Sequence, residues 1–144
     1  MIENKHLLVG IHSDLESVLL HASKVTDFRI LSGKRSEKAQ DELFLQGKTK
    51  ISNSKEAPHV KGLAVDLVPL PFEGWGDIEK NKTYTSHEAG MIAKQRGKFY
   101  YLAGVLFSVA YDFKINLRHG GDWDKDGNYL DQTFDDLVHF EVIV

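Results

Sequence analysis

Two pairs of histidine and aspartate residues, far apart in the chain, constrain its fold more than any other feature. His59 stands seven residues before Asp66, and Asp136 stands three residues before His139. Asp66 lies in an alternating apolar stretch that predicts a β-strand, and His139 opens the last apolar stretch of the chain. If these stretches are neighbouring strands, the four side chains converge, and we therefore expect a sheet that joins them.

The spacings also make demands on the local backbone. Side chains alternate along a strand, so Asp66 faces away from the apolar residues around it. His59 precedes that strand, and a turn around Gly62 is needed to bring its ring over the Asp66 face. In an extended strand, positions three apart face opposite ways, so we predict that Asp136 to His139 form a turn entering the last strand.

The residue types favour a zinc site. Two imidazoles and one carboxylate, from His59, His139 and Asp66, are the ligand set of catalytic zinc sites that keep a fourth position open. A further carboxylate, Asp136, is placed to accept a proton from the attacking water.

The same residues resemble a known family, the zinc peptidases that group D-Ala-D-Ala carboxypeptidases with the L-alanyl-D-glutamate endopeptidases of bacteriophage endolysins. The family pattern is a His and an Asp separated by six residues, with the Gly and Ala found here as Gly62 and Ala64, and later an acidic residue three before a His. Similar flanking segments contain Arg35 and Gln40 upstream and residues 117–123 downstream. One departure is Ala57, where the family usually has Ser.

The resemblance implies a peptidase that acts on the stem peptides of bacterial peptidoglycan. Arg35 would stabilise a developing oxyanion or bind a substrate carboxylate, since a guanidinium donates a planar charged fork. Arg118 and His119 would line the substrate cleft. Asp135 is also an aspartate and is therefore an alternative to Asp136 as general base, but its spacing to His139 does not match the family pattern.

A second metal site is suggested by a run of oxygen ligands at alternate positions. These are Asp122, Asp124, Asp126 and Asn128, with Asp131 as a further oxygen donor. The run is typical of the first half of a calcium-binding EF-hand loop, but Thr133 stands at the position of its bidentate Glu. The alternative is an ordinary acidic surface turn.

Composition limits the number of domains, the chemistry and the partners of the chain. The 144 residues predict one domain, 1–144, that can bury a core without cross-links. Absence of Cys excludes thiol catalysis and thiolate metal sites, and a net charge of −3 without a basic run argues against nucleic acid as a partner. No apolar stretch is long enough to insert in a membrane, and we expect a monomer.

The N-terminal residues lack the cationic and long apolar segments of a secretory signal. A wall-cutting enzyme without a signal stays in the host cytoplasm until lysis or a separate pore releases it to the cell wall. This favours a phage endolysin over a secreted carboxypeptidase.

The apolar periodicity predicts an α+β fold, a small and mostly antiparallel sheet packed with about three helices, with the zinc site at the sheet. Three helices are expected. The first spans 14–24 and begins with a capping box at Ser13, the second runs from residue 36 to a terminating Gly47, and the third spans 86–111. Expected strands are 28–32, 63–68, 113–117 and 139–144. Residues 69–83 form a long loop, a class that is often functional. Trp75 and Trp123 are either wall-contacting or core aromatics, with core favoured for Trp123.

Three functions remain open at this point. The favoured one is an L-alanyl-D-glutamate endopeptidase, ahead of a D,D-carboxypeptidase or dipeptidase of cell-wall peptides. The second is a non-catalytic wall-binding module that keeps zinc for structure, against which Asp136 argues. The third is an unrelated domain in which the His and Asp residues are incidental.

Overall fold

The computed structural model describes residues 1–144 and contains one five-stranded sheet with the strand order β1-β2-β3-β5-β4. The strands are β1 (Ile2–Glu3), β2 (Phe28–Ser32), β3 (Ala64–Pro69), β4 (Leu117–Gly120) and β5 (Asp136–Val142). The helices are α1 (Ser13–Ala22), α2 (Glu37–Leu45) and α3 (Ser86–Asp112), with short 3-10 turns η1 (Lys5–Leu8) and η2 (Ser54–Glu56). Only β1 and β2 pair in parallel. The prediction of an α+β fold with a mostly antiparallel sheet and three helices is confirmed.

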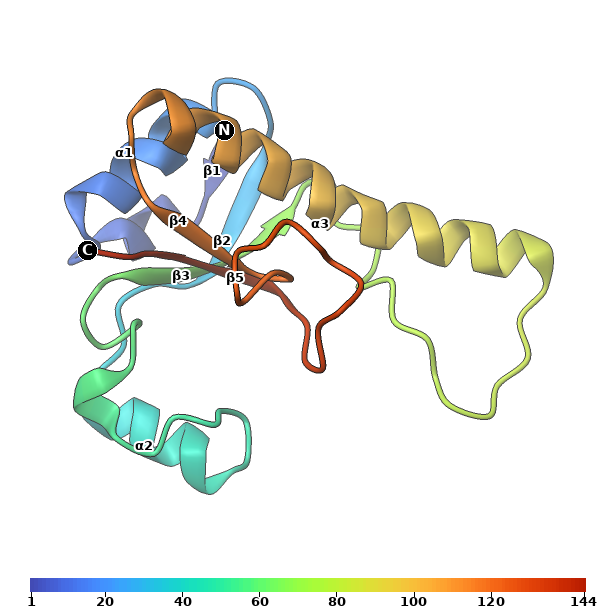
Figure 1. Ribbon diagram of the computed structural model, residues 1–144, viewed down its shortest axis with the longest axis horizontal. Helices are drawn as coiled ribbons and strands as arrows, with labels where there is room; N and C mark the ends of the chain where they lie inside the picture. Colours follow the sequence, from blue (N-terminus) through green and yellow to red (C-terminus); the bar gives the residue numbers. More distant parts are fainter.

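The core lies between this sheet and two of the helices, α1 and the C-terminal half of α3 (Figure 1). Its largest fully buried apolar side chains are Phe28, Phe99, Phe140, Leu15, Leu19, Ile30, Leu67, Leu102 and Leu106. The first three turns of α3 bury no residue, and Figure 1 shows them projecting beyond the sheet. None of the helices is long and apolar enough to cross a membrane.

Helix ends follow the capping residues of the sequence with one exception. Thr85 and Glu88 form a reciprocal capping box at the start of α3, and the Ser36 hydroxyl caps α2. At α1 the capping box predicted at Ser13 is wrong, because the helix begins one residue earlier and the Nδ1 atom of His12 accepts from the Asp14 amide.

Two strand predictions also need correction. Residues 113–116 form a turn after α3, so β4 begins only at Leu117. The two-residue β1 was not predicted, since so short a strand has no detectable alternation; it pairs with Phe28 and Arg29 of β2.

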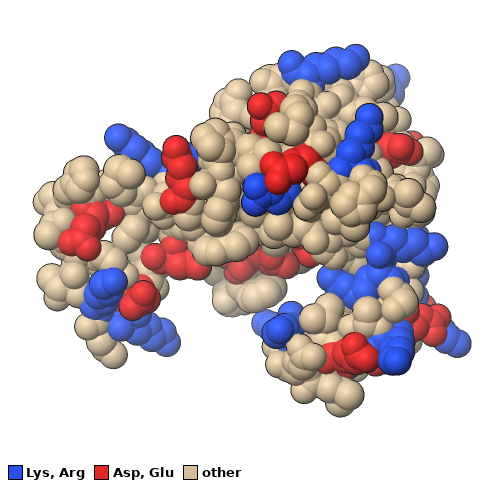
Figure 2. Space-filling view, turned by 180° about the vertical axis from the view of Figure 1, so that it is seen from behind, with Lys and Arg blue, Asp and Glu red and all other residues tan.

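The segment with α2 and η2 lies apart from the helical layer, below the opposite side of the sheet in Figure 1. We call residues 36–57 the arm. Gln40 is the only buried residue of α2. In Figure 2 the arm is the lower right lobe, and a hollow separates it from the projecting part of the molecule on the left.

Candidate active site

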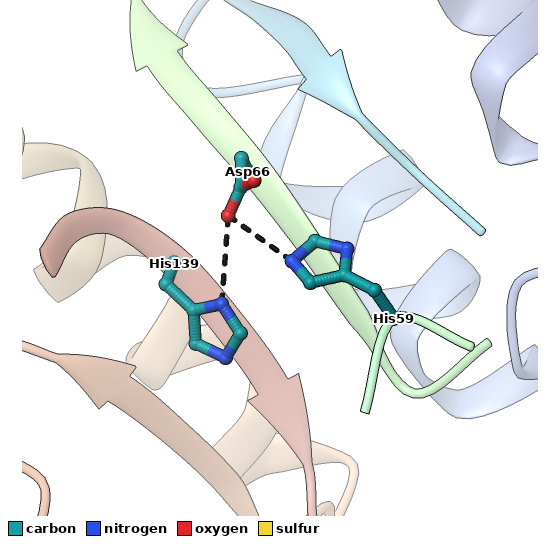
Figure 3. Close-up of side chains that lie close together, drawn as sticks. All are labelled: His59, Asp66 and His139. Carbon is teal, nitrogen blue, oxygen red and sulfur yellow. Dashed lines mark ion pairs between the residues drawn. The ribbon is translucent and has the colours of Figure 1, made fainter. Parts of the chain in front are cut away.

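His59, Asp66 and His139 meet at the middle of the sheet (Figure 3). Asp66 on β3 and His139 on β5 are directly paired across the two strands. The Asp66 Oδ1 atom lies 3.3 Å from His59 Nε2 and 3.4 Å from His139 Nδ1. All three ligand atoms lie within 4.8 Å of one another. The convergence that the sequence required is therefore present.

His59 reaches this position through a tight turn. Gly62 has φ +73°, and a Cβ atom there would lie 2.3 Å from the carbonyl oxygen of Gly10, so only glycine fits. The His59 Nδ1 atom donates to the carbonyl of Gly33 at 2.9 Å. That bond leaves the Nε2 lone pair facing Asp66 and available to a metal ion.

A second carboxylate orients His139 from the other side. The His139 Nε2 atom donates to Glu141 Oε2 at 3.3 Å, so its Nδ1 atom faces Asp66. Glu141 is almost fully buried and forms an ion pair with Arg118, its cross-strand partner on β4. A carboxylate that holds the outer nitrogen of a histidine is the usual support of a metal-binding imidazole.

Asp136 is brought to the same side as His139 by an irregularity in β5. His119 of β4 pairs with Phe140 and the next residue, Gly120, pairs with Asp136, so β5 advances four residues where β4 advances one. The predicted turn is thus a bulged strand, which meets the same geometric demand because a bulge redirects side chains. Asp136 and His139 both line the main cavity.

The charges of the site are strongly coupled. Burial raises the pKa of Asp66, but hydrogen bonds and charge from His139 and His59 outweigh it and hold that pKa well below its usual range. Burial lowers the pKa of His139, yet Asp66 and Glu141 raise it to about 9. The pKa of Asp136 is raised, by burial and by the negative charge of Asp66. A carboxyl with a raised pKa is better suited to accept and return a proton.

Arg35 is held at the edge of this group. Its guanidinium donates to Gln40 Oε1 at 2.7 Å and to the Ser32 hydroxyl at 3.3 Å, and it lies 3.9 Å from an Asp66 oxygen. The buried Gln40 amide in turn donates to Thr49 and to the carbonyl of Ile51. Gln40 therefore ties Arg35 to the arm.

A cavity of about 720 Å³ opens over these residues between the sheet and the arm. Its wall includes Arg35, Lys48, Lys50, Pro58, Arg118, Trp123, Phe134 and Glu141 in addition to the ligands and Asp136. Trp123 was expected in the core, but it lines this cavity, tilted against His139 with ring centroids 5.4 Å apart.

His119 does not lie at the cleft. Its side chain is completely buried, stacks on Phe140, and donates from Nε2 to the carbonyl of Leu137 at 2.8 Å. Burial lowers the pKa of His119 to about 4. The substrate contact expected of His119 is incompatible with this burial, because alternation in β4 turns Arg118 to the cavity and His119 inward.

The acidic loop brings part of its predicted calcium ligands together. Oxygens of Asp122, Asp124 and Asp126 lie within 4.8 Å of one another, and Asp122 Oδ1 is buried without a hydrogen-bond partner. Burial and the neighbouring carboxylates raise the pKa of Asp122. Asn128 and Asp131 are not part of the cluster; their side chains accept from Leu130 N and Gln132 Nε2.

The donor set at the sheet fits a zinc ion. Two nitrogens and one carboxylate oxygen converge, each imidazole has its outer nitrogen engaged, and the ligand atoms face an open cavity. Asp135 does not join them, since it forms an ion pair with Arg96 at 2.6 Å.

Glu141 is the supporting residue that the sequence reasoning missed. Its signal was available, because a residue two positions after His139 on a strand shares its face. The supporting carbonyl of Gly33 had no such signal, since a backbone atom is not marked by residue type.

The chain resembles the solved L-Ala D-Glu endopeptidase ChiX of Serratia marcescens, with a TM-score of 0.69 and 21% identity over 99% of this chain and 90% of that one. This likeness shows a shared fold. No curated protein sequence is significantly similar. The profile of the phage L-alanyl-D-glutamate peptidases matches residues 3–143, and the chain therefore belongs to that peptidase family.

Proposed function

We propose that this protein is a zinc-dependent endopeptidase that hydrolyses the L-alanyl-D-glutamate bond of peptidoglycan stem peptides. The observation that carries the proposal is the convergence of His59, Asp66 and His139 with Asp136 on one cavity wall. A structural metal site needs no free carboxylate beside it, so Asp136 favours catalysis over a binding module.

His59 Nε2, Asp66 Oδ1 and His139 Nδ1 would hold the metal ion. A bound zinc ion supplies a Lewis acid that polarises the scissile carbonyl and makes water acidic enough to deprotonate near neutral pH. The Asp136 carboxylate takes the proton from the attacking water and returns it to the leaving amine of D-glutamate. Arg35, already oriented by Gln40, donates to the oxygen that gains charge.

The biological role that we infer is that of a phage endolysin. Family membership supports it. In this role the enzyme remains in the host cytoplasm until lysis begins and then cuts the cell wall.

The decisive experiment is mass spectrometry of muropeptides after digestion of purified peptidoglycan. The proposal expects new L-alanine carboxyl and D-glutamate amino ends, lost with a zinc chelator and restored by zinc. Loss of a terminal D-alanine would indicate a D,D-carboxypeptidase instead, and bound zinc without any product would indicate a wall-binding module.

Arg35 offers a second test of the same site. Arg35→Ala should leave zinc bound and lower kcat/KM by about 10²–10³-fold, as removal of an oxyanion donor does. Arg35→Lys should restore little, because an ammonium lacks the planar fork. Full activity with lysine would assign a simple charge effect.

We also propose that the loop of Asp122, Asp124 and Asp126 binds calcium. The buried, unpartnered Asp122 Oδ1 beside two further carboxylates supports this, since calcium prefers clustered oxygens. Calcium should increase activity, and Asp124→Ala should abolish the increase while zinc stays bound. If calorimetry detects no calcium binding at about millimolar concentration, the weak end of the range for calcium-binding modules, the loop is an ordinary acidic turn.

A further inference from the structure

Trp75 is an exposed aromatic residue with a fixed position near the candidate base. It lies in the loop between β3 and α3, and 47% of its surface is exposed. Its ring stacks on Phe99 at 6.1 Å between centroids, while Phe72 packs edge-on at 4.9 Å. One face of the indole therefore packs against the protein, and about half of the side chain remains exposed to solvent.

The loop around Trp75 is pinned to α3 rather than loose. Gly76 has φ +71°, and a Cβ atom there would lie 2.6 Å from the Arg96 amide nitrogen. The Gly76 amide donates to Gln95 Oε1 at 3.3 Å. Near the start of the loop, Lys98 forms an ion pair with Glu73 at 3.5 Å. This anchoring holds Trp75 and its neighbour Phe72, which is 37% exposed, at the surface as a packed aromatic pair.

A second cavity, of about 250 Å³, adjoins Trp75. Its wall contains Trp75, Asp77, Arg96, Phe99 and residues 135–138. Asp136 lines both this cavity and the main one, so the candidate base stands where the two meet. Arg96 and Asp135 form an ion pair at 2.6 Å, so their charges offset each other. This leaves an apolar and aromatic wall with two unpaired carboxylates, Asp77 and Asp136, and such a surface is unsuited to an anion.

The main cavity differs from the second one because it has two unpaired lysines in its wall. Lys48 and Lys50 lie on its arm side and form no ion pair with a carboxylate; the Lys50 ammonium instead lies 4.5 Å from the ring centre of Phe134. Arg35 also lines this cavity, but its charge is partly offset by Asp66, 3.9 Å away. The D-glutamate after the scissile bond carries a free carboxylate, so charge complementarity with the two lysines assigns that part of the stem peptide to the main cavity. The portion before L-alanine is then directed to the second cavity.

We propose that Trp75 and the second cavity bind the uncharged, amide-linked muramyl sugar to which the L-alanine is attached. The apolar C–H face of the sugar would lie on the exposed indole, and Arg96 and Asp77 offer hydrogen bonds to its hydroxyl and acetamido groups. The inference rests on the proposed endopeptidase function and specifies how its substrate crosses the site.

The test compares two substrates, a muramyl stem peptide and the same peptide with an acetyl group in place of the sugar. Trp75→Ala should lower kcat/KM for the muramyl peptide by roughly tenfold, the scale of one lost aromatic contact, and leave the sugar-free peptide unchanged. Trp75→Phe should retain part of the preference. Tyr111→Ala, which removes an aromatic residue 84% exposed at the far end of α3, is the control and should change neither rate.

Equal loss on both substrates, or no loss on either, would overturn the sugar site while leaving the endopeptidase assignment intact. A second measurement tests the sugar site independently of the endopeptidase activity. Calorimetry measures the binding of peptide-free glycan strands to the full chain. If the wild type cleaves neither substrate, the endopeptidase proposal fails. The sugar site then stands if Trp75→Ala abolishes glycan binding and falls if that variant binds normally.

Discussion

At the residue scale, His139 is held between two carboxylates that do different work. Asp66 shares its Nδ1 side, where a metal ion would sit, and Glu141 engages its outer nitrogen. Burial raises the pKa of Glu141, but His139 and Arg118 outweigh burial and lower it. The orientation of the His139 ring thus depends on Glu141 and Arg118, which lie outside the candidate ligand set.

Replacing Glu141 by Gln should weaken zinc affinity about 10–100-fold, because the neutral amide supports the imidazole less well than the carboxylate. Competition with a chelating indicator measures this without any assay of activity. Glu79→Gln, at an exposed position, is the control. Unchanged affinity in Glu141→Gln would assign the carboxylate to pairing with Arg118 alone.

Asp136→Asn should keep zinc and lower kcat by about 10²–10⁴-fold, the usual contribution of a positioned base. The matched variant is Asp135→Asn, which removes a neighbouring carboxylate paired with Arg96. Kinetics and metal content of both variants decide the assignment. A larger loss in Asp135→Asn would transfer the role of base to that residue.

At the element scale, the loop from β3 to α3 depends on glycine conformation. Gly76→Ala should destabilise the protein by about 1–2 kcal/mol, because its positive φ is costly for a residue with a Cβ. Gly90→Ala, inside α3 with open space around it, should stabilise by up to about 1 kcal/mol. Urea unfolding compares the two. Stabilisation by both changes would show that the loop adopts another conformation.

The sequence anticipated elements whose signals are local and missed features that depend on neighbours. The strand at Phe28–Ser32, the capping box of Thr85 and the terminating Gly47 all follow from nearby residue types. The grouping of His59, Asp66 and His139 was predicted from their spacing and from the family resemblance. The bulge of β5 was not, because it is defined by pairing with β4 and has no pattern of its own. The exposure of Trp123 to the cavity depends likewise on distant packing.

At the scale of the whole molecule, the metal-free fold should lose stability as pH rises. The pKa of His139 is about 9 in the fold against about 6.5 in an unfolded chain. Its protonated form therefore stabilises the metal-free protein fully below about pH 6.5, and the contribution of about 3 kcal/mol disappears as pH passes 9. Denaturant unfolding over this range should show the decline without zinc and not with it. An equal decline in His139→Asn would assign it to other groups.

The arm has a consequence for how the site is assembled. Since α2 buries only Gln40, the arm has little packing to resist local opening, and its amides should exchange with solvent faster than those of β3. Opening would separate Gln40 from Arg35 and leave the guanidinium held only by Ser32 and Asp66, so its orientation would be less restricted. If Arg35 acts on the substrate as proposed, a substrate bound against the arm would also restore the orientation of this guanidinium, so that binding would itself complete the site.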